Sequence, residues 1–555
     1  MAASVGGGQK VLVVGLSHSC SCVHICFGRC ERALQEGDGG GASQLDSPTG
    51  MHVAATNQVN LALYALHLWM WNSSSSHLQR AQQLVVSLRT TVGEGGGGQA
   101  PVFSGYHCVT FSNMTWGQRV QCLQHVAQHV KQQASRPFVA ISPRSPLSLL
   151  HVAYMSSDFA AHTTGANILG LFRSHNPQVV AVTCMSLSPS DGSGVRASFE
   201  RYCQRFEDVV GLTDAAVAQR INAAGAMLLV DLNGFTHGAR SVVTAMRPAP
   251  ITVFDQGFAG TSGGLASHLN SDRISMSVEM AALVQERIMF MPHSSNPLND
   301  HAVMSSYVPE GEHLSPAPYT RRSLGLPEGD VILANFNNPY NLDATGARAW
   351  AAALKGAGRG VIWMPEWEGL ESTAQRLREL LEQEGVGWNA VVTTPLLPRE
   401  NHLLGRQLSD VRHPSPSLSL YRTHIACYHP LPPPQAALDP PAFNGHGTTA
   451  ESLWAAVPVV TLPGDSIGNR VGAAVSLAAG QDALIARCLG DYVILMQHLL
   501  RRPHVARALR RQLQDARSTA PLWDIRRCGC VVLSCSSDSH RAPTGTRVTG
   551  SARCA

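Results

Sequence analysis

One stretch of the sequence, Phe443 to Asp465 (FNGHGTTAESLWAAVPVVTLPGD), contains residue types that could bind a phosphate group. Its glycines permit a tight turn in which the backbone comes close to a ligand. The candidate donors are His446, Gly447, Thr448 and Thr449. The first N–H groups of a helix have no partner within it, and they attract anions. The pattern predicts either a diphosphate site or an ordinary turn between a strand and a helix.

Glu451 follows this loop in the predicted helix ESLWAA, and VPVVTL then reads as a buried strand. We place Glu451 in the first turn of the helix, where the helix dipole favours a negative charge. It could therefore be only a helix-start residue. Its carboxylate could also accept hydrogen bonds from the hydroxyl groups of a ribose.

Residues 151–172 (HVAYMSSDFAAHTTGANILGLF) predict a strand, a loop and a helix, with His162 just before the helix. An imidazole with a pKa near 6.5 can accept a proton from a hydroxyl at neutral pH. His162 either caps the helix or faces a site. Residues 247–264 predict another strand, which runs into the turn Thr261-Ser262-Gly263. By itself this turn reads as a simple glycine turn.

Six separate motifs, over roughly residues 150–411 and 437–524, resemble segments of the O-GlcNAc transferase / SPINDLY family of glycosyltransferases. They include NGHGTTAESLWAAVPVVTLPG, the SSDF-x-x-H segment and RPAPI…GTSG. The resemblance implies the GT-B fold, an α/β architecture in which two Rossmann-like domains face each other across a cleft. The cleft motifs contain no Asp-x-Asp pair, so we expect no metal and no other cofactor.

In this family, the matching loop holds the pyrophosphate of the sugar donor and the acidic residue holds the ribose. The resemblance implies that Arg399 and His402 bracket the nucleotide base, and that His162 is the catalytic base or positions the acceptor. The implied donor-binding residues are Thr261, Ser262, Gly263, Asn338, Asn341, Leu397, Arg399, His402, His446, Gly447, Thr448, Thr449 and Glu451.

Some positions depart from the family pattern. The family typically has lysine at Asn341, where it neutralises the diphosphate, and glutamine at Asn338. Ala224 and Met227 replace an acidic residue and a histidine of the animal enzymes. A neutral amide in place of an ammonium stabilises a leaving diphosphate less, by roughly a few kcal/mol.

The function implied is inverting transfer of GlcNAc from UDP-GlcNAc to Ser or Thr of intracellular proteins. Two alternatives stay open. One is a protein O-fucosyltransferase of SPINDLY type that uses GDP-fucose, because the loop form GHGTTAE lies between the animal and plant patterns. The other is a catalytically degenerate relative that binds a nucleotide without turnover, because of Asn341.

Composition supports a globular chain: 44% of the 555 residues are hydrophobic and 14% are charged. The net charge of +4 is too small to indicate nucleic-acid binding, and no apolar run approaches the roughly 20 residues that span a membrane. We expect a cytoplasmic or nuclear protein. Eight of the 14 cysteines lie near the two ends, and we expect the other six to be free thiols, mostly in the core.

Strands alternate with helices, which predicts parallel sheets covered on both faces. A Gly/Ser-interrupted region whose tracts predict poor order (1–110) and a helical lead-in (111–150) precede two Rossmann-like halves (151–316 and 317–524). Two segments do not fit this pattern. The proline-rich stretch 412–436 predicts a surface excursion, and the tail 525–555 has no periodicity.

Overall fold

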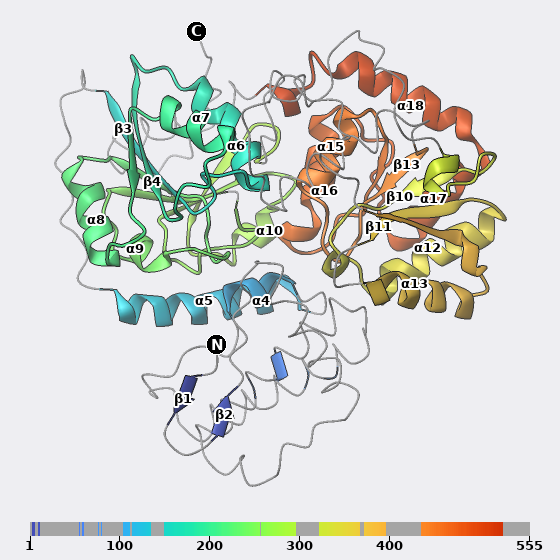
Figure 1. Cartoon of the computed structure of the whole chain (residues 1–555), viewed down its shortest axis with the longest axis horizontal. Coiled ribbons are helices and arrows are strands. Elements are labelled where there is room, and N and C mark those ends of the chain that lie inside the picture. Colours follow the sequence, from blue (N-terminus) through green and yellow to red (C-terminus); the bar gives the residue numbers. More distant parts are fainter. Residues whose placement is uncertain are drawn as a thin grey trace.

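Two parallel β-sheets, one in each half, organise the part of the chain that the structure describes (Figure 1). The computed structural model describes residues 104–110, 114–134, 149–255, 257–295, 321–366, 371–395 and 434–524, with the short pieces 3–5 and 9–11 and five single residues between 55 and 79. The short pieces form an antiparallel pair, β1 (Ala3–Val5) and β2 (Gln9–Val11), which belongs to neither sheet.

The first half contains a seven-stranded sheet with the order β5-β4-β3-β6-β7-β8-β9, in which every neighbouring pair is parallel. The strands are β3 (Leu150–Ser156), β4 (Val180–Ser186), β5 (Arg205–Asp208), β6 (Leu228–Asp231), β7 (Ile251–Phe254), β8 (His268–Asp272) and β9 (Arg287–Met291). The helices are α6 (Thr163–Ser174), α7 (Gly194–Tyr202), α8 (Asp214–Ala223), α9 (Ser241–Ala245) and α10 (Val278–Ala281).

Helices cover both faces of this sheet. Val152 and Tyr154 of β3 pack in one cluster with side chains of α6 and α7. Ala153 and Met155 alternate with them and pack in another cluster with side chains of α8 and α9. A parallel strand buried on both faces has an almost continuous apolar sequence, and the observed layers confirm the prediction made from it.

The second half contains a five-stranded parallel sheet with the order β12-β11-β10-β13-β14, which repeats the order β5-β4-β3-β6-β7 of the first half. The strands are β10 (Ile332–Ala334), β11 (Val361–Glu366), β12 (Val391–Pro395), β13 (Ala436–Leu438) and β14 (Val459–Val460). The α-helices are α12 (Ala344–Ala357), α13 (Glu371–Gln383), α15 (Gly447–Trp454), α16 (Val471–Ala478), α17 (Leu489–Arg501) and α18 (Pro503–Ala516). The 3-10 helices are η2 (Arg322–Leu324), η3 (Pro339–Asn341), η4 (Trp388–Ala390), η6 (Ile467–Asn469) and η7 (Pro521–Trp523).

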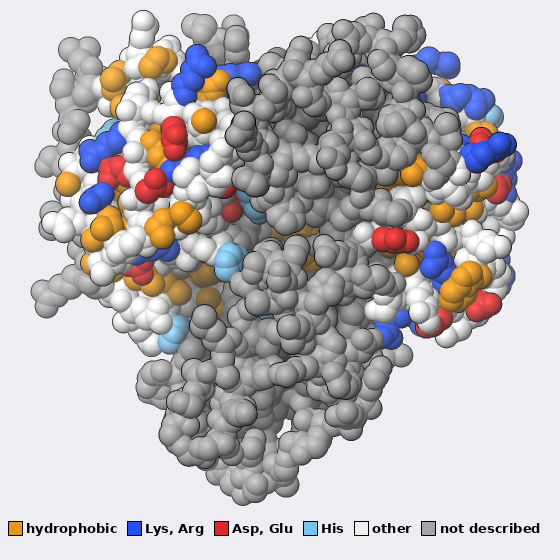
Figure 2. Space-filling model, viewed as in Figure 1, with side chains coloured by type: hydrophobic (Ala, Val, Ile, Leu, Met, Phe, Trp, Pro, Cys, Tyr) orange, Lys and Arg blue, Asp and Glu red, His pale blue; other side chains and the backbone are white. Residues whose placement is uncertain are grey.

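The two halves are in direct contact. The guanidinium group of Arg470, just before α16, donates from Nε to the carbonyl of Ile274 in the first half at 2.7 Å. One hydrophobic cluster also contains buried side chains of both halves, such as Met276 and Val471. Acidic and basic side chains are mixed on both lobes in this view (Figure 2). Among the described helices, none is long and apolar enough to cross a membrane.

Two further helices, α4 (Gly105–Thr110) and α5 (Trp116–Gln133), precede the first half. Thr115 begins α5 with a reciprocal pair of hydrogen bonds to Gln118, which satisfies N–H groups at the helix start. The sequence of α5 places Val120, Leu123, Val126 and Val130 in an apolar stripe; the first three are buried, and Val130 is half-buried.

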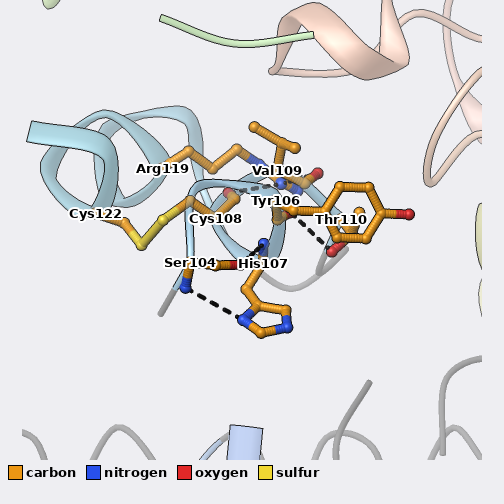
Figure 3. Close-up of a disulfide and its surroundings, with 8 residues drawn as sticks. All are labelled: Ser104, Tyr106, His107, Cys108, Val109, Thr110, Arg119 and Cys122. Carbon is orange, nitrogen blue, oxygen red and sulfur yellow. Dashed lines mark hydrogen bonds between the residues drawn. A yellow bond between two sulfur atoms is a disulfide. The ribbon is translucent and has the colours of Figure 1, made fainter. Parts of the chain in front are cut away.

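The buried guanidinium of Arg119 holds α4 against α5, because it donates to the carbonyls of Cys108 at 3.3 Å and Val109 at 2.5 Å (Figure 3). It also donates to the carbonyl of Met114, between the two helices, at 3.0 Å. A disulfide between Cys108 and Cys122 also joins the two helices.

The prediction of free thiols is wrong for four cysteines. The structure pairs Cys108 with Cys122 and Cys184 with Cys203, with Cα–Cα distances of 5.8 and 6.0 Å. Sequence spacing did not show that the fold brings these side chains together. Cys488 is a free cysteine, but it is exposed and caps α17, so it is not a core residue either.

The predicted excursion at 412–436 is wrong at its last residues. The prolines end at Pro434, and the N–H of Gln435 donates to the carbonyl of Ile332 at 2.8 Å. Ala436 begins β13, a central strand between β10 and β14. The rest of that stretch and the tail after residue 524 lie outside the described residues. So do the cysteine-rich segment 18–30 and residues 60–71, where the apolar sequence that begins at Val59 predicts a buried helix.

Candidate functional site

The loop between β13 and α15 forms the centre of the candidate site. Asn444 anchors it, because its N–H donates to the carbonyl of Gly468 at 2.9 Å and its Oδ1 accepts the N–H of Gly472 at 3.1 Å. Helix α15 begins at Gly447, three residues after Asn444. The backbone N–H groups of residues 446–449 donate to no acceptor among the described residues. A helix start with these free donors favours a negatively charged group.

The threonine hydroxyls of the loop are already used as donors inside the protein. Thr448 Oγ1 donates to Asn337 Oδ1 at 2.6 Å, and Thr449 Oγ1 donates to Asp439 Oδ1 at 3.4 Å. Asn337 is in turn held by Asn335 and by the carbonyl of Leu438. In this structure the donors left for an anion are therefore the backbone N–H groups.

Asn341 is the last residue of η3, which follows β10 and borders the loop, and Asn338 directly precedes η3. The Asn338 side chain caps η3 by accepting the N–H of Tyr340 at 3.4 Å. Asn341 is 6% exposed, and its Nδ2 donates weakly to the carbonyl of Asn444 at 3.5 Å. Its Oδ1 is buried without a hydrogen-bond partner among the described residues. The structure therefore places this amide, which replaces a lysine of the family pattern, directly against the loop.

Glu451 lies in the second turn of α15, so the prediction of a first-turn residue is wrong. The helix begins earlier than predicted because Gly447, Thr448 and Thr449 already have helical conformation. The Glu451 side chain is 1% exposed, and burial raises its pKa well above the usual value. A buried acid beyond the helix start is not explained by the helix dipole alone.

His446 is the last loop residue before α15, and its ring stacks on Phe443 with centroids 5.2 Å apart. Its Nε2 lies 3.4 Å from the carbonyl of Gly468, which places the proton on Nε2. Burial lowers the pKa of His446 to about 4. The ring is therefore neutral at pH 7 in this state, and a bound diphosphate would favour its protonation.

Protonation of His446 gives a pH prediction for stability. Its pKa is about 4 in the folded chain and near 6.5 when unfolded, so the unfolded state binds the proton over this interval. Its contribution to the free energy of unfolding should fall as pH drops from 6.5 to 4, by about 1 kcal/mol per pH unit. Buried acids such as Asp439, whose pKa burial raises to about 7, act in the opposite direction.

The comparison of wild type with His446→Gln therefore isolates this effect. Urea unfolding at pH 7.5, 5.5 and 4.5 should show the variant gaining stability relative to wild type as the pH is lowered. An equal difference at all three values would show that His446 titrates normally.

The second group of candidate residues surrounds His162. Its side chain caps α6, which was one of the two roles predicted for it. Its Nδ1 lies 3.3 Å from the N–H of Thr164 and 3.5 Å from Asp158 Oδ1. Asn233 holds this loop from β6, because it accepts the N–H of Ser157 at 2.6 Å and donates to Asp158 at 3.3 Å. The His162 side chain is 39% exposed, so a ligand can reach it.

The two contacts of His162 require different tautomers. A hydrogen bond from the Thr164 N–H needs a lone pair on Nδ1, which places the proton on Nε2. A hydrogen bond to Asp158 needs the proton on Nδ1 and leaves Nε2 free to accept a proton. A general-base role at Nε2 therefore requires the pairing with Asp158.

The turn Thr261-Ser262-Gly263 is buried, and Glu286 holds it. The Glu286 carboxylate accepts the hydroxyls of Thr261 and Ser262 and the N–H of Ser262, each at 2.6 Å. A side chain at Gly263 would meet the backbone of Leu123 on α5. The predicted contact of this turn with the donor remains a prediction.

The structure thus brings some predicted residues together and separates others. Asn338, Asn341 and the 446–451 segment form one group, while His162 and the 261–263 turn lie in the first half. No hydrogen bond between described residues joins His162 to the 446–451 segment. Leu397, Arg399 and His402 lie outside the described residues.

Sequence reasoning missed Asn233, Asn337 and Asp439. Each lies within three residues of the carboxyl end of a central parallel strand, where ligand sites of open α/β sheets occur. That position was the available signal. The described residues contain no group of three or more His, Cys, Asp or Glu that could hold a metal ion.

Comparison with known proteins identifies the class and then the family. A solved structure of a mutant O-GlcNAc transferase of Thermobaculum terrenum superimposes with a TM-score of 0.68 and 19% identity, covering 93% of this chain and 94% of that one. Two Rossmann-like halves with this likeness define a GT-B glycosyltransferase fold. The sequence profile of glycosyl transferase family 41 matches residues 118–314, 308–425 and 434–531, and the chain belongs to this family.

Curated relatives agree with this assignment. The Arabidopsis thaliana protein named "Probable UDP-N-acetylglucosamine--peptide N-acetylglucosaminyltransferase SEC" is 30% identical over 381 residues, which cover 68% of this chain and 36% of the relative. The UDP-N-acetylglucosamine--peptide N-acetylglucosaminyltransferase of Caenorhabditis elegans is 22% identical over 482 residues, covering 68% and 39%. The chain thus spans less than two fifths of the length of these relatives.

Proposed function

We propose that the chain is a protein O-linked N-acetylglucosamine transferase that moves GlcNAc from UDP-GlcNAc to Ser or Thr of cytoplasmic or nuclear proteins. The main support is the start of α15, where the N–H groups of residues 446–449 have no acceptor among the described residues. Preorganised N–H donors of this kind stabilise the charge of a departing diphosphate. Family membership and the names of the relatives support the donor and the acceptor class.

In the proposed reaction the acceptor hydroxyl oxygen bonds to the anomeric carbon, and the bond from that carbon to the diphosphate oxygen breaks. The hydroxyl proton passes to Nε2 of His162 while Nδ1–H donates to Asp158. The negative charge of the leaving diphosphate collects at the start of α15. The sugar is attacked from the face opposite the diphosphate, so its configuration inverts.

A transfer assay with radiolabelled UDP-GlcNAc and GDP-fucose on peptide acceptors tests the proposal, together with titration of the chain with UDP and GDP. Transfer from UDP-GlcNAc is the expected result. Transfer from GDP-fucose alone would replace it with the SPINDLY-type function. Nucleotide binding without transfer from either donor would support the degenerate binding protein, which the uncharged Asn341 favours. Binding of neither nucleotide would contradict all three functions.

His162→Ala is expected to lower kcat by about 10²- to 10³-fold, because it removes the group that accepts the proton. The affinity for UDP should stay within two-fold, since His162 is not hydrogen bonded to the 446–451 loop. Asp158→Asn should lower kcat by about ten-fold and change its pH profile, because the imidazolium loses its partner. Equal losses of kcat and UDP affinity in His162→Ala would contradict the assignment.

A further inference from the structure

A buried carboxylate lies directly beneath the 443–449 loop. Asp439, the first residue after β13, is 1% exposed. Its Oδ1 accepts the N–H of Gly445 at 2.6 Å, and its Oδ2 accepts the hydroxyl of Thr461 at 2.6 Å. Among the described residues, no Lys, Arg or His forms an ion pair with it. The neighbouring α16 leaves no space, because a side chain at Gly472 would come within 1.8 Å of Oδ2.

The first half contains the same arrangement at the equivalent strand. Asp231 ends β6, is 1% exposed, and accepts the N–H groups of Asn233 at 3.1 Å and Gly234 at 3.0 Å. Its other oxygen accepts the hydroxyl of Thr244 at 2.6 Å. In both halves a buried aspartate therefore holds an Asn-Gly turn with one oxygen and a threonine hydroxyl with the other.

The position of Asp439 explains how the loop presents its donors. Since Gly445 N–H points inward to the carboxylate, the turn is fixed immediately before the free N–H groups of residues 446–449. The weaker bond from Thr449 ties the first turn of α15 to the same carboxylate. The burial of an unpaired charge is costly, and burial raises the pKa of Asp439 to about 7.

We infer that Asp439 is a positioning residue for the diphosphate of the donor: it holds Gly445 inward so that the next N–H groups face the ligand. This inference rests on the proposed function, because it assumes that a nucleoside diphosphate binds at the start of α15. Asp439 does not contact the diphosphate itself. Replacement of Asp439 should therefore reduce the part of the binding free energy that comes from the diphosphate and leave the part that comes from the nucleoside unchanged.

The test compares affinities for UDP and uridine, measured by calorimetry, in wild type and in Asp439→Ala. The variant is expected to lower the affinity for UDP by about ten-fold or more and to keep the affinity for uridine within two-fold of the wild-type value. Asp439→Asn keeps one oxygen that can accept the N–H of Gly445, so this variant should fold. It should lower the affinity for UDP by about three-fold and leave the affinity for uridine unchanged. Asp231→Ala is the matched control, because it removes an equally buried carboxylate from the other half, and it should leave the UDP affinity within two-fold.

The outcomes separate the two hypotheses. If wild type binds UDP and both Asp439 variants bind it equally well, the positioning role is wrong and the proposed function stands. Parallel losses of UDP and uridine affinity would show a general structural role and would overturn the inference. If Asp439→Ala does not fold, the ratio of UDP affinity to uridine affinity in Asp439→Asn, compared with that of wild type, decides whether the inference holds. If the wild type binds GDP instead of UDP, the same comparison is made with GDP and guanosine. If the wild type binds neither nucleotide, both the positioning role of Asp439 and the proposed function are wrong.

Discussion

Replacement of Asn341 by lysine is expected to raise the rate of sugar transfer by about 10²-fold. The side chain borders the 443–449 loop, and among the described residues its amide makes one weak hydrogen bond, to Asn444 at 3.5 Å. An ammonium at this position would add a full charge next to the departing diphosphate, and charge-assisted hydrogen bonds are roughly twice as strong as neutral ones. A gain of 10² corresponds to about 2.7 kcal/mol in the barrier. The measurement is kcat with UDP-GlcNAc and a peptide acceptor.

Asn338→Lys is the matched control, because it adds the same charge to the same 3-10 turn, where the native side chain caps the backbone of Tyr340. It should raise kcat far less than Asn341→Lys does. If the Asn341→Lys variant binds UDP more tightly but transfers no faster, the neutral amide is not what limits turnover. Equal effects of the two lysines would show that the gain is general electrostatic attraction.

The second large effect is expected from Gly445→Ala, which should weaken UDP binding by about 10²-fold or abolish it. A Cβ at this position would lie 2.3 Å from Asn337 Oδ1 and from Thr448 Oγ1, so the turn would have to move. That movement would break the hydrogen bond from Gly445 to Asp439 and shift the free N–H groups that follow. The measurement is UDP affinity together with the thermal unfolding midpoint.

Gly329→Ala is the control in the same half, because a Cβ there would meet no atom within 4 Å. It should change neither UDP affinity nor the unfolding midpoint appreciably. Full UDP affinity in Gly445→Ala would mean that the loop can relax around a methyl group. The loop geometry would then not determine the binding.

Strand and helix alternation was enough to predict both parallel sheets, because buried parallel strands are almost continuously apolar. Strands β3, β4, β6 and β11 were visible for this reason. Strand β5 (Arg205–Asp208) and strand β8 (His268–Asp272) were missed, since their polar sequences do not resemble a buried strand. Their positions depend on pairing with neighbours, which the local sequence does not encode.

The candidate site was predictable only in part. The 446–449 donors could be predicted because glycine and threonine at a helix start have a local explanation. The roles of Asp439 and Asn233 could not, because each depends on a partner from another strand or loop. The disulfides were missed for the same reason. The features that could not be predicted from the sequence therefore depend mostly on contacts between residues that are far apart in the chain.

The short helix α4 supports the candidate site through a chain of aromatic contacts. Its Tyr106 lies edge-on to Tyr340 of η3, with ring centroids 6.2 Å apart, and Tyr340 in turn approaches Phe443 of the loop at 6.4 Å. Any shortened version of the chain that starts after Thr110 would remove this aromatic support from beneath the turn that carries Asn341. An expression boundary chosen from the sequence motifs alone would thus remove part of the support of the proposed nucleotide site.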